Sequence, residues 1–215
     1  MKKIVLALSA LFLSLPLLAF AHQPRLIETE TVEVVDPEVS KAYYAKLTGE
    51  PHLYRIQSDV PFRLYANVLI PDLPDAKKDV TAAVLKADDA ERPIVILGGP
   101  DAAWKAYHEE FGDDDYLQSD EFRQDLPAGS YEVRVWSSNN DSAYVLAIGD
   151  KEEFPPGEIL NALSVMPRIK ETVFGKPWYS AYLTPFVLPK LAMTALAVLA
   201  VVVVAAVLIR RRKRV

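Results

Sequence analysis

The residues of this chain that could do chemistry are few and widely separated. Its three histidines are His22, His52 and His108, and it has no cysteine. A zinc site needs three or four closely placed His, Cys or carboxylate ligands, which this spacing does not offer. We find no nucleophile-elbow, zinc-protease or phosphate-binding motif. The sequence therefore predicts no catalytic residue, metal ligand or cofactor-binding residue. We interpret the chain as a non-enzyme, with an unrecognised hydrolase as the least favoured alternative.

Two loops are rich in oxygen ligands. They are Asp113 to Asp115 and Asn139 to Asp141. Calcium takes about six to eight oxygens, but neither loop has the alternating spacing that aims carboxylates inward. We therefore interpret both as solvated turns, and calcium binding is the alternative.

An aromatic cluster in the middle of the chain is a candidate ligand platform. Trp104, Tyr107 and Phe111 recur at helical spacing, which predicts a short helix over residues 102–111. Together with Tyr116 these rings could stack on sugars, because binding sites are commonly lined by aromatic side chains. A small satellite core is the alternative. The predicted residues of the ligand platform are Trp104, Tyr107 and Tyr116.

Both ends of the chain carry membrane-related signals. Residues 1–21 combine Lys2 and Lys3, an apolar run and an Ala-Phe-Ala site, which is typical of a signal peptide cleaved after Ala21. An uncleaved membrane anchor is the alternative. Residues 191–209 carry no charge, and this length of helix spans roughly 28 Å, close to the apolar thickness of a bilayer. We predict a transmembrane helix over residues 186–209.

The residues that flank this helix predict its orientation. A basic tail, residues 210–215, follows it and should remain in the cytoplasm, so the preceding chain lies outside the cytoplasmic membrane. Aromatic and basic side chains would mark the two membrane surfaces. The predicted anchor residues are Trp178, Tyr179, Tyr182, Lys190, Arg210, Arg211, Arg212, Lys213 and Arg214.

The exported region is strongly acidic. Eight of the 24 Lys and Arg residues lie outside residues 22–189, which leaves 16 against all 29 Asp and Glu, a net charge of −13. Such a surface repels nucleic acid. We interpret the charge as favouring solubility, and attraction of cations or basic partners is the alternative. The length suits one hydrophobic core, and without cysteine this core must form without disulfides.

Short β-type runs separated by Pro, Gly and Asp dominate residues 22–152. Residues 62–70 alternate apolar and polar side chains, which predicts a half-buried antiparallel strand. Residues 131–136 and 143–148 resemble the arms of a hairpin around an Asn-rich turn. Eight or nine such strands predict an all-β, antiparallel β-sandwich.

Residues 153–185 follow a different pattern. Apolar residues recur every three or four positions between Pro155 and Phe174, which predicts an amphipathic helix that starts at Pro155-Pro156. Pro167 should kink or divide it. We expect this helix to pack on the sheet, next to an aromatic linker that leads into the membrane.

Two segments resemble a known family. Gly49 to Ile56 running into Val60 to Tyr65, and Leu126 to Val135 with Tyr144 to Gly149, are similar to the opening strands and closing hairpin of bacterial pre-peptidase C-terminal domains. The resemblance covers about half of the exported region. It implies a jelly-roll-like β-sandwich that serves secretion, folding or binding rather than catalysis.

Together these patterns predict a bacterial envelope protein. Its exported sandwich would be periplasmic or at the cell surface, and would bind or assemble with another envelope or membrane protein. A glycan- or calcium-binding surface module is the alternative function.

Overall fold

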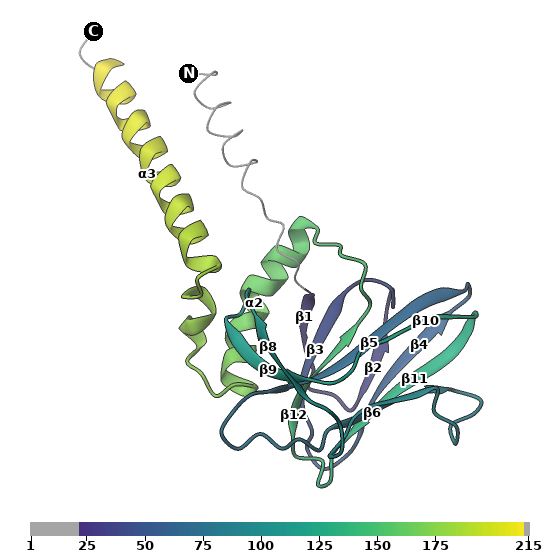
Figure 1. Ribbon diagram of the computed structural model, residues 1–215. Coiled ribbons are helices and arrows are strands. Elements are labelled where there is room, and N and C mark those ends of the chain that lie inside the picture. The colour runs from purple at the N-terminus through teal and green to yellow at the C-terminus, as the bar shows by residue number, and fades with distance from the viewer. Residues whose placement is uncertain (1–21, 213–215) are drawn as a thin grey trace.

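A computed structural model describes residues 22–212. The predicted signal peptide, residues 1–21, lies outside the described residues, as do residues 213–215. Two β-sheets face each other, and helices follow at the C-terminal end (Figure 1).

The first sheet, sheet A, has seven strands. Their order is β1 (Gln23–Leu26), β3 (Lys41–Lys46), β12 (Ala143–Ile148), β5 (Phe62–Pro71), β9 (Asp114–Gln118) and β8 (Lys105–Glu109), and β10 (Phe122–Leu126) also pairs with β5. The five strands of sheet B are β2 (Thr31–Val34), β4 (His52–Ser58), β11 (Gly129–Trp136), β6 (Thr81–Lys86) and β7 (Val95–Gly98). The all-β sandwich prediction is confirmed, with twelve strands in the described residues instead of eight or nine.

The sandwich is mixed, so the prediction of a purely antiparallel arrangement is wrong. β1 pairs with β3 in parallel, and β2 pairs with β4 in parallel. The first four strands alternate between the two sheets, so each returns to its own sheet only after a crossing. A strand that returns through a crossover can lie parallel to its neighbour.

The predicted hairpin at residues 131–148 is also wrong. β11 pairs with β4 and β6 in sheet B, whereas β12 pairs with β3 and β5 in sheet A. The Asn-rich turn therefore carries the chain from one sheet to the other. Its left-handed residue is Asn140, with φ 48°, and the Asn140 side chain accepts a hydrogen bond from the Ser137 N–H. Local turn chemistry was visible in the sequence, but the partners of each strand were not.

Residues 102–111 form β8 and a turn, and not the predicted helix. Tyr107 pairs directly with Tyr116 of β9, and the connecting turn places Asp113 at φ 56°. The Glu109 carboxylate accepts hydrogen bonds from the Phe111 and Gly112 N–H groups, which fixes this turn. Cross-strand aromatic pairing thus overrides a helical period that extended over only three rings.

The inner core lies between the two sheets and contains a buried polar network. Tyr54, Tyr144 and His52 are each 2% exposed or less. The Tyr144 hydroxyl lies 2.8 Å from both the Tyr54 hydroxyl and His52 Nδ1. Buried polar groups that bond to one another avoid the energetic penalty of desolvation without a partner.

The outer face of sheet A carries a second core. Both faces of β5 are buried from Leu64 onward, which corrects the prediction of a half-buried strand. The cover is α2 (Pro156–Thr172), whose Met166 and Ile169 pack with Tyr44, Tyr65 and other residues of the sheet. This confirms that the amphipathic helix packs on the sheet.

Of the two outcomes that we predicted for Pro167, division does not occur, because α2 continues through this residue to Thr172. Proline has no N–H group, so the carbonyl of Leu163, four residues earlier, loses its helical donor. The Tyr182 hydroxyl donates a hydrogen bond to that carbonyl at 2.8 Å. Tyr182 ends a short 3₁₀ helix, η1 (Trp178–Tyr182), so the unpaired carbonyl becomes a docking point for the next element.

The last element is α3 (Val187–Arg212), which extends away from the sandwich (Figure 1). Within the described part of the chain, no helix was found to have the length and apolarity that crossing a membrane requires. The predicted span includes positions 204, 205 and 207–209, whose side chains lie outside the described residues.

The buried histidine network predicts a loss of stability in mild acid. Burial lowers the pKa of His52 below its ordinary value of about 6.5. The unfolded chain therefore binds the proton more readily, so the stabilisation is complete above pH ~6.5 and declines as pH falls toward the folded-state pKa. We expect His52→Gln to flatten this part of the profile, measured by denaturant unfolding between about pH 7 and 5. His22, whose pKa is also lowered by burial, contributes with the same sign. An unchanged slope in His52→Gln would contradict the assignment.

Candidate functional site

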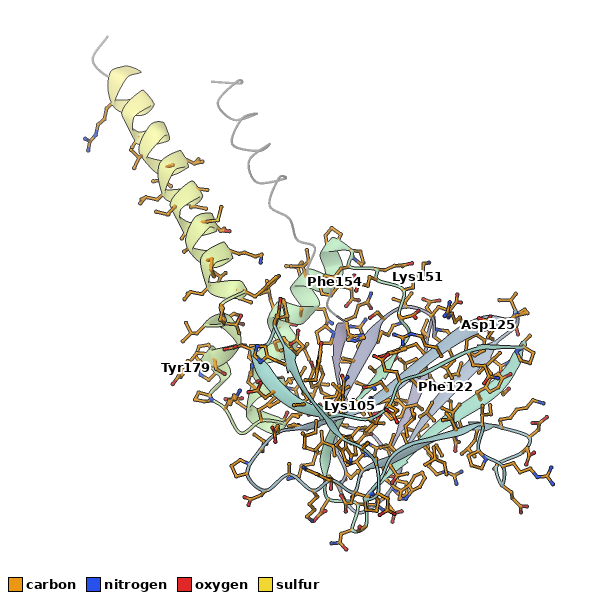
Figure 2. The ribbon with its side chains drawn as sticks, in the orientation of Figure 1. Lys105, Phe122, Asp125, Lys151, Phe154 and Tyr179 are labelled. Carbon is orange, nitrogen blue, oxygen red and sulfur yellow. The ribbon has the colours of Figure 1, made fainter. Side chains whose placement is uncertain are left out.

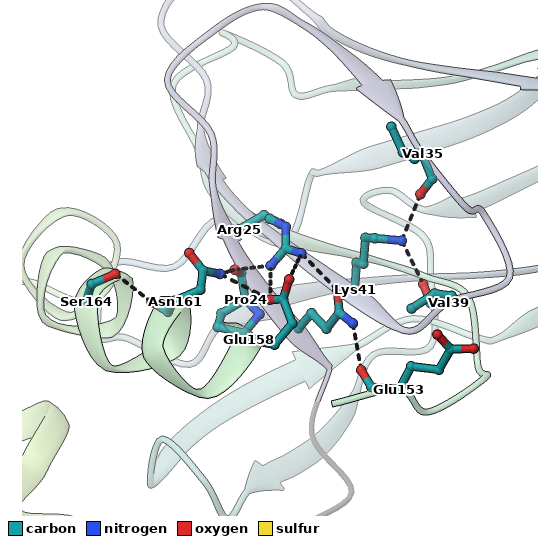
Figure 3. Close-up of polar contacts among 10 residues, drawn as sticks. Pro24, Arg25, Val35, Val39, Lys41, Glu153, Glu158, Asn161 and Ser164 are labelled. Carbon is teal, nitrogen blue, oxygen red and sulfur yellow. Dashed lines mark hydrogen bonds and ion pairs between the residues drawn. The ribbon is translucent and has the colours of Figure 1, made fainter. Parts of the chain in front are cut away.

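The first half of α2 is attached to strand β1 by polar contacts (Figure 3). Arg25 of β1 donates two hydrogen bonds to Glu158 in the first turn of α2, both at 2.8 Å. The Asn161 side chain donates to the Pro24 carbonyl at 3.2 Å. A two-pronged Arg–carboxylate pair fixes orientation as well as distance. The N-terminal end of α2 therefore has a defined position on the sheet.

The other end of α2 is held by a buried ionic cluster. Lys170 Nζ lies 2.6 Å from one oxygen of Asp114, and Lys176 Nζ lies 2.7 Å from the other. Lys170 also donates to the Gly112 carbonyl. The side chains of Lys170 and Asp114 are 1% and 0% exposed, whereas Lys176 is 41% exposed. This cluster joins the helix to the β8–β9 hairpin through interactions that water cannot replace.

The ionic cluster changes the interpretation of the first oxygen-rich loop. Asp114 is not in a solvated turn, because both its oxygens accept from lysines. Asp115 instead lies 2.8 Å from His108 Nδ1, and this hydrogen bond raises the pKa of His108. In the second loop, Asp141 pairs with Lys77 at 2.5 Å. Among residues 22–212, no group of three His, Cys, Asp or Glu side chains could hold a metal ion.

Strands of sheet A line a cavity of about 140 Å³. Four tyrosine rings, two carboxylates and two carboxamides line it together with His22 and four small or aliphatic side chains. The lining residues are His22, Ala42, Tyr44, Tyr65, Asn67, Leu69, Tyr107, Glu109, Tyr116, Gln118, Glu121, Val145 and Ala147. Two larger hollows, of about 430 and 560 Å³, lie elsewhere, and no tyrosine lines either. Chemistry-bearing groups thus converge on the smaller cavity.

Burial shapes the electrostatics of this cavity. It raises the pKa of Glu109, although the N–H groups of Gly112 and Phe111 partly offset the effect. Burial also keeps the Tyr44, Tyr65 and Tyr116 hydroxyls protonated by raising each pKa above its ordinary range. Among the described residues, the Tyr116 hydroxyl has no hydrogen-bond partner. The cavity therefore offers neutral aromatic rings next to buried acceptor groups.

The structure brings together two of the three predicted platform residues. Tyr107 and Tyr116 line the cavity, with their ring centroids 6.3 Å apart. Trp104 packs against the inner core, and its indole N–H donates to the Gly99 carbonyl. Phe111 lies in the β8–β9 turn against Phe186, which precedes α3. Tyr107 and Tyr116 thus lie on neighbouring strands of sheet A and not on a helix face.

Of the predicted anchor residues, Trp178, Tyr179, Tyr182 and Lys190 lie near the start of α3. Trp178 and Tyr179 are 54% and 49% exposed, and Figure 2 places Tyr179 on the side away from the sandwich. Lys190 lies over the Phe186 ring, with Nζ 3.0 Å from its centroid. Arg210 is exposed. The side chains of Arg211 and Arg212, together with Lys213 and Arg214, lie outside the described residues.

Sequence reasoning missed Lys170, its pairing with Asp114, and the tyrosines contributed by β3 and β5. Lys170 had a detectable signal, since it adjoins Ile169 within the apolar stripe of an amphipathic helix. A lysine in such a stripe requires a buried acidic partner. Tyr44 and Tyr65 gave no comparable signal, because tyrosine is common in ordinary strands.

These features define a class: a mixed β-sandwich with a C-terminal helical unit fixed to one face. No protein-family model matches the chain, and no curated protein matches it. Among solved structures, the pre-peptidase C-terminal domain of a collagenase from Bacillus anthracis is similar, with TM-score 0.33 and 9% identity, covering 60% of this chain and 97% of that domain. A β-glucosidase from Paenibacillus barengoltzii is also similar, with TM-score 0.27 and 10% identity, covering 60% of this chain and 13% of the enzyme. The structure, like the sequence, thus shows a weak similarity to a pre-peptidase C-terminal domain.

Proposed function

We propose that this chain is a non-enzymatic, single-pass protein of the bacterial cytoplasmic membrane. Its signal peptide is removed, residues 186–209 span the bilayer and the basic tail lies in the cytoplasm. The sandwich faces the periplasm or cell surface and binds or assembles with another envelope or membrane protein.

The observation that carries the proposal is the exposure of α3. Its apolar side chains between residues 191 and 203 point in all directions around the helix, and eight large ones are 41% to 66% exposed. They are Leu191, Met193, Leu196, Val198, Leu199, Val201, Val202 and Val203. A helix that is apolar on all sides needs an apolar environment. The sandwich does not cover this one, so a bilayer is the environment we propose.

The attachment of α2 supports a fixed arrangement and not a flexible tether. Arg25–Glu158 and Lys170–Asp114 fix both ends of the helix, and Tyr182 joins α2 to η1. The exposed Trp178 and Tyr179 are suited to the membrane surface, where one part of an aromatic ring is apolar and another is wet. The sandwich would therefore keep a constant orientation above the membrane.

A binding or assembly role agrees with the remaining features. The acidic exported region favours a basic partner surface, which would also accelerate association.

Membrane insertion is tested by placing charges in the apolar helix of the full chain. We expect Leu196→Arg combined with Leu199→Arg to move much of the protein out of carbonate-washed membranes, since each central arginine opposes insertion by about 2.5 to 3.5 kcal/mol. Leu160→Arg is the matched control, because Leu160 is 69% exposed but lies on α2. Equal membrane retention of the double variant and the control would refute the anchor.

The assembly role needs a separate experiment. The full chain is cross-linked in cells and purified in mild detergent, and a variant with α3 replaced by an unrelated single span is treated identically. We expect one membrane or envelope protein to co-purify in stoichiometric amount with the natural chain. Recovery of the chain alone after cross-linking would count against assembly.

A further inference from the structure

The tyrosine-lined cavity arises from the curvature of sheet A. Three strands lie between β3 and β8 in the strand order β3-β12-β5-β9-β8, yet Tyr44 of β3 and Tyr107 of β8 line the same cavity. The sheet therefore curls until distant strands face each other. The floor of the cavity is formed by short side chains. Ala42 pairs with Ala147 of β12, and Ala147 pairs on its other side with Asn67 of β5. Two small side chains next to each other leave the space that the rings surround.

The walls of the cavity are suited to a positive charge. The faces of Tyr44, Tyr65, Tyr107 and Tyr116 carry partial negative charge, which attracts cations within about 6 Å of a ring centroid. The Tyr65 ring already makes a cation–π contact within the chain. The guanidinium carbon of Arg123 lies 4.5 Å from the centroid of the Tyr65 ring.

The carboxylates supply the complementary negative charge. Each Glu109 oxygen accepts one backbone N–H, at 2.8 and 2.7 Å, which leaves a second lone pair on each. Glu121 lies at the mouth, where it accepts from Tyr65 at 3.2 Å and also pairs with Arg123. No lysine or arginine is among the described residues that line the cavity. Two fixed cations lie outside the lining: Lys170, bonded to the Gly112 carbonyl, partly offsets the rise in the pKa of Glu109, and Arg123 pairs with Glu121.

The size of the cavity restricts the ligand. At about 30 Å³ for each water in the liquid, 140 Å³ holds only a handful of non-hydrogen atoms. Access is available, because Tyr107 is 40% exposed and the Glu121 side chain is 41% exposed. We propose that this cavity binds a small organic ammonium ion, with its charged head among the four tyrosine rings and against Glu109. This site is independent of the membrane anchor and of the protein partner.

The test uses the purified full chain in detergent and three probes. Choline supplies the ammonium head, and 3,3-dimethylbutan-1-ol is its neutral carbon isostere. Isothermal calorimetry should show saturable binding of choline and at least tenfold weaker binding of the alcohol. Phosphocholine distinguishes a lipid headgroup from a free cation. If phosphocholine binds as tightly as choline, the site is assigned to a lipid headgroup. We expect phosphocholine to bind more weakly, because Glu121 repels its phosphate, and this result would assign the site to a free ammonium ion.

Variants then locate the binding. Glu109→Gln removes the charge but keeps an acceptor for the turn, and Tyr107→Leu removes a half-exposed ring from an edge strand. Each should weaken choline binding roughly tenfold, as expected for the loss of one favourable charge or ring contact. Ala147→Leu should abolish binding by filling the floor. His108→Ala is the control, because His108 follows Tyr107 on β8 and points to the opposite face.

Two results would overturn the proposal. One is equal binding of choline and its neutral isostere, which would show that charge plays no part. The other is unchanged choline binding in Glu109→Gln and Ala147→Leu, with both variants folded by circular dichroism. Loss of membrane insertion or of a protein partner would leave choline binding intact, so failure of the proposed function is distinguishable from failure of this site.

Discussion

Replacing Lys170 with Met is expected to lower the free energy of unfolding by about 3–5 kcal/mol, because removing one partner of a buried ion pair leaves the other uncompensated. Asp114 is fully buried and would retain only Lys176, which is itself 41% exposed. The Gly112 carbonyl would also lose its donor. Urea unfolding of the full chain in detergent, followed by tryptophan fluorescence, measures the change.

Two further variants separate charge from packing. Lys176→Met removes the exposed partner and should lower the free energy of unfolding by only about 1 kcal/mol or less, as for a solvent-screened pair. Adding Asp114→Asn to Lys170→Met should recover much of the loss, because the buried charge is gone. If the double variant is no more stable than Lys170→Met alone, the buried charge is not the cause.

Gly149→Ala is the second change with a large expected effect. Gly149 follows β12 with φ 78°, and an added Cβ would lie 2.5 Å from the Val39 carbonyl oxygen and 2.6 Å from that of Glu38. The left-handed backbone costs a residue with a side chain about 1–2 kcal/mol, and a forced shift of packed structure adds about 1–3 kcal/mol. We therefore expect a total loss of about 2–5 kcal/mol, measured by the same unfolding experiment.

Gly49→Ala is the matched control for this prediction. Gly49 also has positive φ, at 108°, but an added Cβ would meet no atom within 4 Å. Only the cost of the left-handed backbone then applies, so the free energy of unfolding should fall by about 1–2 kcal/mol. Equal losses in the two variants would show that the close approach of the Val39 segment contributes nothing.

Gly149 and Lys170 lie near the two ends of the contact between the sandwich and α2. Val39 forms a bridge with Lys151, just beyond Gly149, and this bridge directs the chain from β12 toward α2. Lys170 fixes the far end of the same helix. Both variants therefore weaken the positioning of α2 as well as stability, and both should loosen the orientation of the sandwich that we propose above the membrane.

The sequence by itself determined the features that depend on neighbours along the chain. Alternation located strands such as residues 62–70, and a three-to-four residue period located α2 with Pro156 at its first position. The net charge of residues 22–189 and the apolar run of residues 191–209 were also readable directly. Each of these signals repeats within a few residues, so no tertiary information is needed to detect it.

Only the tertiary structure decided which distant residues meet. The segment around Tyr107 became a strand because β9 pairs with it, and β11 and β12 separated because each sheet offered two other neighbours. Lys170 met Asp114 from 56 residues away. Sheet pairing and burial depend on contacts between remote segments, and a local period records that a face is apolar without recording what covers it. For that reason the sandwich could be predicted, whereas the ionic cluster and the tyrosine-lined cavity could not.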